Sequence, residues 1–588
     1  MRRKVIMHVG PTNSGKTHMA LRALAASSSG VYAGPLRLLA HEIWERLNKG
    51  RIVPLGVEPE PGSEPDTSIN SDIIAEKDRN PSVRLDGNPR YARPCNLRTG
   101  EEFRIVDDNA PLVSCTVEMA WLDRVLDVAV VDEIQLIADP ERGSAWTMAV
   151  LGLAAREVHL CGEETAVPII QELLKDTGDE LIINRYQRLT PLDVEDQSLR
   201  GDLSRIKKGD CVVTFSRNNI FAMKAKVEKA TGLLCAVAYG KLPPEIRSEQ
   251  AALFNDPNSG YDVIVASDAI GMGLNLKIKR VIFEALDKYD GHEQRPLSIS
   301  QIKQIAGRAG RYGLHGKPGG LVTTLNDDDL PRLRVALATP PDSLPYALLE
   351  PSEFWMGDVA QILPPTASTR SLFEVACYVS KVLPPFRAIA HRKLEEISKF
   401  LDTRAADLLL SEKLLFRNAP ANWREPVLMD ALTRITKLFG TALRVDLDDV
   451  LSVAPLKATL KDVEVMMTGE KENDPDTCAK ALKTLETLHR VLVLYLWLSF
   501  RNQMAFHQTQ YAYILKGQVE RALEWCLRQL SSQADFNELA DFGLRQPAVD
   551  GLQYRYTPKS AELRDQSVLT GAAAATKALG HKLPQRSK

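Results

Sequence analysis

Along the first 325 residues, short apolar runs alternate with stretches of helical character. One series of runs lies at 4–9, 30–37, 111–116, 127–135 and 157–163, and a second lies at 210–217, 236–240, 261–266, 280–283 and 321–325. The run at 127–135 begins with continuous, valine-rich apolar residues, which is typical of a strand buried on both faces of a parallel sheet. Strands that alternate with helices indicate an α/β fold. We therefore predict two α/β domains, at residues 1–190 and 191–340.

The last third of the chain has a helical pattern. Proline pairs at 340–341, 364–365 and 384–385 predict short connectors, because proline ends helices, and residues 371–381 and 387–401 predict helices between and after them. A polar break at 468–476 separates a helical domain at 341–465 from a helical bundle at 466–535. The apolar run at 491–500 is too short to span a bilayer and predicts a buried helix, and no membrane partner is expected.

Two segments have the composition of surface or flexible chain. Residues 48–91 are rich in Pro, Glu, Asp, Gly and Asn, which predicts a long surface insertion in the first domain. Residues 536–588 form a basic tail with a flexible composition; such a tail is usually only solvated, and its charge also suits contact with RNA or a nuclease.

Composition narrows the classes of protein only slightly. The 588 residues carry 74 Lys and Arg against 76 Asp and Glu, so nucleic-acid binding requires local basic surfaces, and an ordinary soluble enzyme is equally compatible. The eight cysteines include no CxxC pair, which argues against a zinc site or a disulfide framework. The first strand begins at Lys4, leaving no room for a transit peptide, so the protein is either cytosolic or cut before its natural start.

The loop after the first strand has the pattern GxxxxGK[ST]. Glycines in such a loop let backbone N–H groups face phosphate oxygens, and the following helix adds its dipole. Lys16 would contact the β- and γ-phosphates of a nucleotide, and Thr17 would hold Mg²⁺. The predicted nucleotide-binding residues are Gly10, Pro11, Thr12, Asn13, Ser14, Gly15, Lys16 and Thr17.

Two carboxylates stand at the end of the valine-rich strand, where α/β sheets place their ligands. Asp132 would hold Mg²⁺ through water, and Glu133 would polarise the water that attacks the γ-phosphate. The alternative is an Asp-Glu pair that begins a surface helix. The preceding phosphate loop favours the catalytic interpretation.

The second α/β domain has no GxxxxGK[ST] loop, which suggests a partner that closes on the nucleotide held by the first. Gly271 lies in a glycine-containing string, 266–275, that permits close backbone approach to phosphate or nucleic acid. Arg308 and Arg311 are three residues apart and would share a helical face. Such arginines stabilise the charge that develops on the γ-phosphate, although a solvated basic helix end would look similar.

Four strings in order, GPTNSGKT, VVDEIQ, SDAIGMGLN and QIAGRAGR, resemble those of superfamily-two helicases. More closely, the chain is similar to the mitochondrial degradosome RNA helicases of the suppressor-of-Var type. GPLRLLAHEIWERLN, PCNLRTGEE, VSCTVEMA, VVDEIQLIADPERGSAWT, EVHLCGE and DCVVTFSRNNI carry this likeness, which covers residues 5–313 and continues more weakly toward the C-terminus.

The resemblance implies two RecA-like domains and an ATP-dependent helicase that moves 3′ to 5′ on RNA in the mitochondrial matrix. It implies that Lys16, Glu133, Gln304, Arg308 and Arg311 are catalytic, with Gln304 and both arginines reaching ATP from the second domain. Asp132 and Gly271 would complete the nucleotide site. Positions that match the RNA-lining residues of the family are Pro35, Arg37, Thr99, Gly100, Ser216, Arg217 and Ser267.

The resemblance also implies partners: RNA, with duplex DNA and RNA–DNA hybrid as further candidates, and a degradosome exoribonuclease. The C-terminal helices would cover the RNA channel; the plain alternative is a packed helical appendage without RNA contact. Gln135 replaces the Asp of DEAD-box proteins and no adenine-reading motif precedes the loop, so relaxed choice among nucleoside triphosphates is expected. Two other functions stay open: an RNA- or DNA-stimulated ATPase that remodels complexes without unwinding, and a degradosome scaffold.

Overall fold

The computed structural model describes residues 2–58, 87–289, 293–310, 319–364, 366–389, 391–421, 423, 425–452, 455–469 and 475–532. The chain divides into two compact units, Met1–Leu539 and Ala540–Lys588, and all described residues belong to the first. The predicted basic tail at 536–588 and most of the predicted insertion therefore lie outside the described residues. No helix in the described ranges is both long and apolar enough to cross a membrane.

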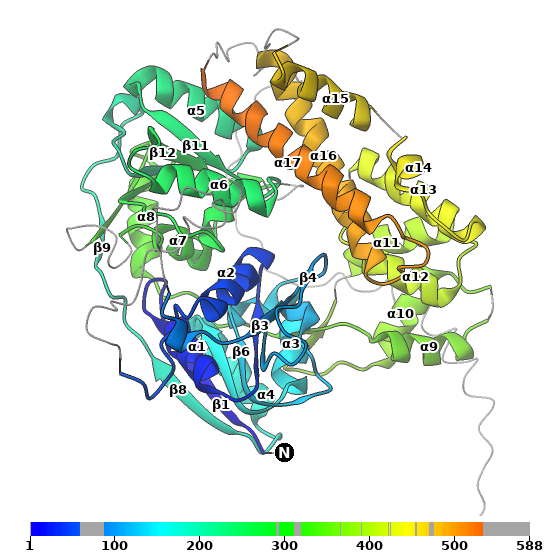
Figure 1. The fold of residues 1–588 in the computed structure, drawn as a ribbon. Helices are drawn as coiled ribbons and strands as arrows, with labels where there is room; N and C mark the ends of the chain where they lie inside the picture. Colours follow the sequence, from blue (N-terminus) through cyan, green and yellow to red (C-terminus); the bar gives the residue numbers. More distant parts are fainter. Residues whose placement is uncertain are drawn as a thin grey trace, which may run out of the picture. The chain divides into compact units, whose positions relative to one another are not determined.

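The first α/β domain is built on an eight-stranded sheet in the order β4-β3-β5-β2-β6-β7-β1-β8 (Figure 1). Its strands are β1 (Lys4–Val9), β2 (Gly30–Gly34), β3 (Cys95–Arg98), β4 (Phe103–Arg104), β5 (Leu112–Thr116), β6 (Val125–Val131), β7 (Ala154–Gly162) and β8 (Glu180–Arg185). Its helices are α1 (Lys16–Ala26), α2 (Arg37–Asn48), α3 (Gly143–Gly152) and α4 (Val167–Leu174). All neighbouring strands are parallel except β3 and β4, which form an antiparallel hairpin.

The two faces of this sheet explain the valine-rich run. Ala129 and Val131 lie in the core on one face of β6, while Val128 and Val130 lie in the core on the other. Successive side chains of a strand point to opposite faces, so a strand covered on both sides is apolar at every position. The prediction of a strand buried on both faces is confirmed.

The second α/β domain contains a six-stranded, wholly parallel sheet in the order β11-β12-β10-β13-β16-β9. Its strands are β9 (Leu192–Val194), β10 (Asp210–Val213), β11 (Leu234–Ala238), β12 (Tyr261–Ala266), β13 (Arg280–Phe283) and β16 (Gly320–Thr324). Its helices are α5 (Arg217–Thr231), α6 (Pro244–Asn255), α7 (Ile299–Ala306) and α8 (Asp329–Ala338). A separate antiparallel pair consists of β14 (Asp287–Tyr289) and β15 (Gln294–Pro296).

The C-terminal region is helical, as predicted, with one small addition. Its helices are α9 (Glu353–Ile362), α10 (Thr369–Val379), α11 (His391–Thr403), α12 (Leu410–Arg417), α13 (Pro426–Thr441), α14 (Leu447–Leu451), α15 (Leu456–Met467), α16 (Pro475–Ser499) and α17 (Thr509–Ser532). The prediction of a helix starting at Arg387 was wrong, because β18 (Phe386–Ala388) pairs in parallel with β17 (Ala347–Leu349). The buried side chains of these helices and of one face of the second sheet form a single cluster.

The ends of the predicted insertion at 48–91 belong to the first domain. Ile52 and Tyr91 are buried, and the backbone N–H of Asn88 donates to the carbonyl of Gly50 at 3.3 Å. Residues 55–58, 89 and 90 are exposed, so these end segments lie at the surface as predicted, and Ile52 and Tyr91 anchor them to the domain. Residues 59–86 lie outside the described part of the chain.

Candidate functional site

The loop between β1 and α1 has the backbone shape of a phosphate loop. Gly15 has a φ of 76° and Asn13 a φ of 61°, a left-handed conformation that glycine and asparagine tolerate. A Cβ atom on Gly10 would lie 2.6 Å from the carbonyl oxygen of Tyr186, so only glycine fits there. The Lys16 ammonium donates to the carbonyls of Gly10 at 3.0 Å and Pro11 at 3.3 Å, which holds it over the loop.

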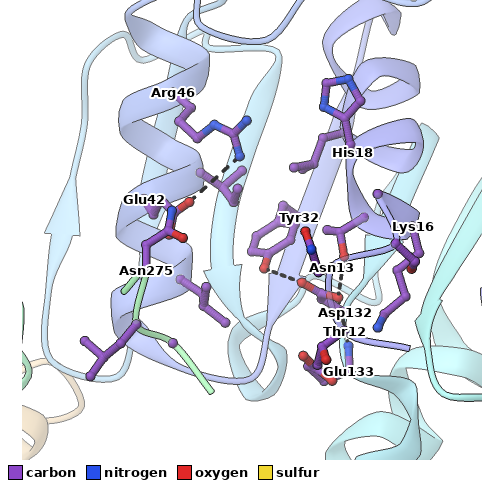
Figure 2. A pocket seen from close by; sticks show the side chains of 18 of the residues that line it. Thr12, Asn13, Lys16, His18, Tyr32, Glu42, Arg46, Asp132, Glu133 and Asn275 are labelled. Atoms are coloured by element: carbon purple, nitrogen blue, oxygen red, sulfur yellow. Dashed lines mark hydrogen bonds and ion pairs between the residues drawn. The ribbon is translucent and has the colours of Figure 1, made fainter. Parts of the chain in front are cut away.

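Asp132 is buried at the end of β6, and its carboxylate accepts hydrogen bonds from two hydroxyl groups. Thr17 Oγ1 donates to its Oδ1 at 3.2 Å, and Tyr32 Oη donates to its Oδ2 at 3.0 Å (Figure 2). Burial and the neighbouring Glu133 charge raise the pKa of Asp132 to about 6. A divalent cation would favour the charged form, and hydroxyl and carboxylate oxygens are the donors that Mg²⁺ prefers. The residues present therefore fit a magnesium ion.

Glu133 occupies an unusual backbone conformation, with a φ of 51°. A non-glycine residue in this region is strained and is found where a site requires it. The amide nitrogen of Gln135 donates to the Glu133 carboxylate, and the Gln135 side-chain oxygen accepts from the backbone N–H of Glu163 at 3.2 Å. Gln135 thus ties the orientation of Glu133 to the end of β7.

Arg308 of the second domain faces the same site. Its guanidinium group donates to the carbonyls of Gly271 and Leu274, and the charges of Glu133 and Asp132 act on it. Helix α7 ends at Ala306, so Arg308 lies in the following turn and the prediction that it belongs to a helical face was wrong: Gly307 ends the helix. Arg311 lies outside the described residues.

One cavity of about 400 Å³ is lined by both α/β domains. The predicted residues along it are Thr12, Asn13, Ser14, Gly15, Lys16, Thr17, Asp132, Glu133 and Arg308. Gly10, Pro11, Gly271 and Gln304 are not among its lining residues; Gly271 instead accepts the Arg308 hydrogen bond, and a Cβ atom on it would lie 3.5 Å from Gln304 Oε1.

The cavity also extends between α1 and α2, where Glu42 and Arg46 face it with Asn275 of the second domain (Figure 2). Sequence reasoning did not identify these residues, and it also missed Tyr32. Glu42, Arg46 and Asn275 lie within strings that carry the family resemblance, but those strings alone assign them no role.

Arg188 links the phosphate loop to the turn that carries Arg308. Its guanidinium donates to the carbonyls of Thr12 at 3.0 Å and Gly307 at 2.8 Å, and also to that of Ala309. Burial lowers the pKa of Arg188 to about 10. The sequence prediction missed Arg188, whose only signal is its place next to the predicted domain boundary at 190.

Comparison with known proteins identifies the fold and this arrangement of motifs. A model described as the DEXQ-box helicase domain of Suv3 matches residues 1–59 and 84–186, the helicase conserved C-terminal domain matches 196–313, and the ATP-dependent RNA helicase SUV3 C-terminal domain matches 482–529. The mitochondrial DExH-box ATP-dependent RNA helicase DExH16 of Arabidopsis thaliana is 39% identical over 91% of this chain and 83% of its own length.

The chain belongs to the SUV3 family of ATP-dependent RNA helicases. Mitochondrial SUV3 of Oryza sativa is 39% identical over 87% of this chain and 77% of its own length. Human mitochondrial SUPV3L1 is 38% identical over 85% of this chain, which covers 57% of that protein. The predictions of family, of an ATP-hydrolysing RNA helicase and of RecA-like domains are confirmed, and the relatives' names agree with the predicted mitochondrial location.

In this SUV3-family helicase, Gly100 is the predicted RNA position of the first domain that lies directly against a C-terminal helix among the described contacts. Thr99 is buried, and its hydroxyl accepts the backbone N–H of Glu102 at 3.1 Å, which closes a turn. A Cβ atom on Gly100 would lie 3.2 Å from Trp497 on α16. Pro35 is buried at the end of β2.

Arg37 of the helicase joins a network of charges that spans three parts of the chain. It pairs with Glu101 and lies 3.9 Å from Glu245 on α6. Lys516 on α17 donates to Glu245 at 2.9 Å and to Glu520 at 2.5 Å. Burial alone would raise the pKa of Glu245, but Arg37 and Lys516 lower it.

The same network contains a group with metal-binding geometry, formed by Glu245, His489 and Glu520. The Lys516 ammonium already lies between the two carboxylates and provides the cation that they require. We therefore interpret these residues as an ion network that joins α6 to α16 and α17.

In the second domain, Arg217 is engaged by the C-terminal region. Its Nε and Nη2 donate to Glu486 Oε1 on α16 at 3.2 and 3.0 Å, and Tyr239 Oη donates to the same oxygen at 2.5 Å. Ser216 is exposed, and Ser267 accepts the backbone N–H of Ala269 at 3.1 Å, capping a short turn. RNA contact by these residues stays a prediction.

Proposed function

We propose that this helicase translocates 3′ to 5′ on single-stranded RNA, unwinds duplexes ahead of it, and supplies RNA to degradation and surveillance in mitochondria. One observation carries the mechanism: Lys16, Asp132 and Glu133 of the first domain line the same cavity as Arg308 of the second. A nucleotide held between two domains couples its hydrolysis to their closing and opening.

Each group at the cavity then has a defined task. Lys16 would neutralise the phosphates, and Thr17 and Asp132 would hold a magnesium ion, which would supply further positive charge next to the phosphates. Glu133, oriented by Gln135, accepts a proton from the attacking water. Arg308, with Arg311 and Gln304 as further candidates, stabilises the charge on the γ-phosphate, an effect worth about 10³–10⁵ in rate for such a finger.

Unwinding follows from movement along one strand. Contacts to the RNA backbone carry little sequence information, so sequence preference should be weak. In the proposed arrangement, residues 1–190 and 191–340 form the motor, and the helical parts at 341–465 and 466–535 cover the RNA. The partner is an exoribonuclease that degrades the released strand, and duplex DNA and RNA–DNA hybrid are further candidate substrates.

The deciding experiment is strand displacement on RNA and DNA duplexes that carry either a 3′ or a 5′ single-stranded tail. We expect ATP-dependent displacement of 3′-tailed RNA and little activity on 5′-tailed substrates. Displacement from 5′ tails alone would overturn the polarity. RNA-stimulated ATP hydrolysis without displacement would favour a remodelling ATPase, and hydrolysis without any RNA stimulation would favour a scaffold role.

Lys16→Ala is the matched control for the same assay. We expect it to abolish ATP turnover without loss of the fold, because Lys16 is the only side chain of the phosphate loop with a positive charge. Arg311→Ala should retain ATP binding and lose RNA-stimulated hydrolysis. Normal turnover by the Lys16 variant would contradict the assignment of the phosphate loop.

A further inference from the structure

Three arginines, two of them close to Gly100, have no acidic partner among the described residues. Within the described residues, no carboxylate lies at ion-pair distance from Arg98, Arg124 or Arg501, and the buried Nε of Arg98 has no hydrogen-bond partner. The neighbouring carboxylates pair with other arginines: Glu118 pairs with Arg142 at 2.7 Å, and Glu102 pairs with Arg104 at 2.5 Å. This part of the surface therefore carries positive charge that the protein itself does not neutralise.

Each of these arginines instead lies over an aromatic ring. The Arg124 guanidinium is 3.9 Å and that of Arg98 is 5.4 Å from the centre of the Trp121 ring, and Arg98 is also 5.8 Å from the centre of the Phe103 ring. Arg501 lies 3.5 Å from the centre of the Trp497 ring. Attraction to a ring face holds a guanidinium group without using all of its N–H donors. Arg501 Nη1 also donates to the carbonyl of Trp497 at 2.9 Å.

Three parts of the chain build this arrangement, and residues 121–124, which follow β5 and precede β6, contribute Trp121 and Arg124. The β3–β4 hairpin contributes Arg98 and Phe103, and the end of α16 with the residues after it contributes Trp497 and Arg501 (Figure 1). The rings of Phe103 and Phe500 meet edge to face with their centres 4.8 Å apart, and Arg501 donates to the Gly100 carbonyl at 3.4 Å. The arrangement is thus continuous with a position at which family resemblance predicts RNA.

The positive charges of Arg98 and Arg501 also repel each other. Burial and the Arg98 charge lower the pKa of Arg501 to about 10. An anion between the two guanidinium groups would relieve this repulsion. Phosphodiester groups bind arginine through charge-assisted hydrogen bonds, and nucleobases stack on aromatic rings and on guanidinium planes. Phe103 keeps 40% of its surface exposed, which leaves an aromatic surface for a base.

We propose that Arg98, Phe103, Trp121, Arg124, Trp497 and Arg501, here called the arginine–aromatic cluster, bind a segment of single-stranded RNA where the first domain meets α16. This site extends the predicted RNA path at Gly100 and rests on the proposed function. An acidic peptide could satisfy the charge, but the combination of flat cations with an exposed ring suits nucleotides better, because peptide carboxylates do not stack.

The test measures the affinity of the full chain for a short fluorescein-labelled oligouridine by fluorescence anisotropy, over about 50 to 200 mM KCl. Arg124→Gln and Arg501→Gln should each weaken binding about five- to tenfold and lower the slope of log K against log salt by about 0.7, the value for one lost contact to a single strand. Arg501→Lys should restore most of the salt slope but not the full affinity, because lysine keeps the charge and loses the planar group.

Arg142→Gln is the matched control, since it removes one nearby positive charge that Glu118 already neutralises. It should leave affinity and slope within twofold of wild type, and thermal unfolding of every variant should confirm that the chain folds. Phe103→Leu should reduce the preference for oligouridine over an abasic chain of equal length.

The outcomes separate this site from the proposed function. Unchanged affinity and slope in Arg124→Gln and Arg501→Gln, while the wild type binds RNA, would overturn the cluster and leave the helicase mechanism intact. An equal loss in Arg142→Gln would also overturn it, as a general charge effect. If the variants lose binding of an oligoglutamate peptide and keep RNA, the site is a peptide site. Absence of RNA binding and of RNA-stimulated hydrolysis in the wild type would instead overturn the proposed function.

Discussion

The contact between Arg217 and Glu486 offers a quantitative test of how the C-terminal helices are held. Glu486 is 1% exposed and its Oε1 accepts three donated hydrogen bonds, two from Arg217 and one from Tyr239. Burying a carboxylate is costly unless it is paired, and removing one partner of a buried pair costs about 3–5 kcal/mol. Because the Arg217 side chain is 24% exposed, we expect a cost somewhat below this range, about 2–4 kcal/mol.

The perturbations are Arg217→Met, Glu486→Gln and the double variant. Arg217→Met leaves the carboxylate without its cation, so α16 should open locally about 30- to 1000-fold more often, the equivalent of 2–4 kcal/mol. The double variant should recover at least about 1.5 kcal/mol relative to the sum of the single changes, because neither charge is then left alone. As a control, Lys175→Met removes an exposed pair with Glu172 at the end of α4 and should change the opening of α16 by less than about 0.5 kcal/mol.

Hydrogen exchange measured by mass spectrometry suits this chain, since several domains make a single unfolding transition hard to interpret. The peptides to follow cover α16 and the start of α5. The anchoring role would be refuted if α16 exchanged at the wild-type rate in Arg217→Met while the salt slope of RNA binding fell by about 0.7. That result would instead support the direct RNA contact predicted from family resemblance.

Three further predictions concern the motor. Glu133→Gln should bind nucleotide normally and lose about 10²–10⁴ in turnover, measured by phosphate release, since it removes the general base; undiminished turnover would contradict that role. Arg188→Ala should lower kcat for RNA-stimulated hydrolysis more than it raises KM for ATP, because the substitution releases the phosphate loop from Gly307. Arg188→Lys should recover only part of the lost kcat, because one ammonium group cannot reach all three carbonyls. Burial and the His159 charge lower the pKa of His8 to about 4, so the unfolded chain binds more protons between pH 6.5 and 4. Opening of β1 should therefore become easier by about 1–3 kcal/mol as the pH falls through this window. His8→Gln should flatten this dependence in hydrogen exchange of β1 peptides, corrected for the intrinsic effect of pH on exchange, and an unchanged dependence would count against the role of His8.

The structural features that could be predicted from the sequence are those that consecutive residues determine. The phosphate loop and the Asp132-Glu133 pair are short strings whose chemistry depends on consecutive positions, so their pattern indicates their geometry. The buried strand β6 was predictable for the same reason, since burial on both faces leaves a continuous apolar run. The end of α7 was not predicted, because Arg308 was expected to lie on a helical face, whereas the helix already ends at Gly307.

The contacts that were not predicted join residues far apart in the chain. Tyr32 lies 100 positions from Asp132, Arg188 lies 176 from Thr12, and Arg217 lies 269 from Glu486. Periodicity and short motifs carry no information on such pairings, which depend on how the sheets and helices pack. Tyr32 looked like one more apolar residue of a strand, and only the fold places its hydroxyl group on the carboxylate that would hold the metal.

The distant partners also change how the nucleotide site is understood. The Arg188 hydrogen bonds run from the phosphate loop to the turn that carries Arg308, and every acceptor is a backbone carbonyl. A backbone carbonyl accepts a hydrogen bond whatever side chain its residue carries. This link therefore does not depend on the side chains of Thr12, Gly307 or Ala309. A movement of the phosphate loop on hydrolysis would therefore displace the Arg308 turn directly. In the proposed mechanism the phosphate loop and the Arg308 turn would then move together, because the Arg188 hydrogen bonds link them.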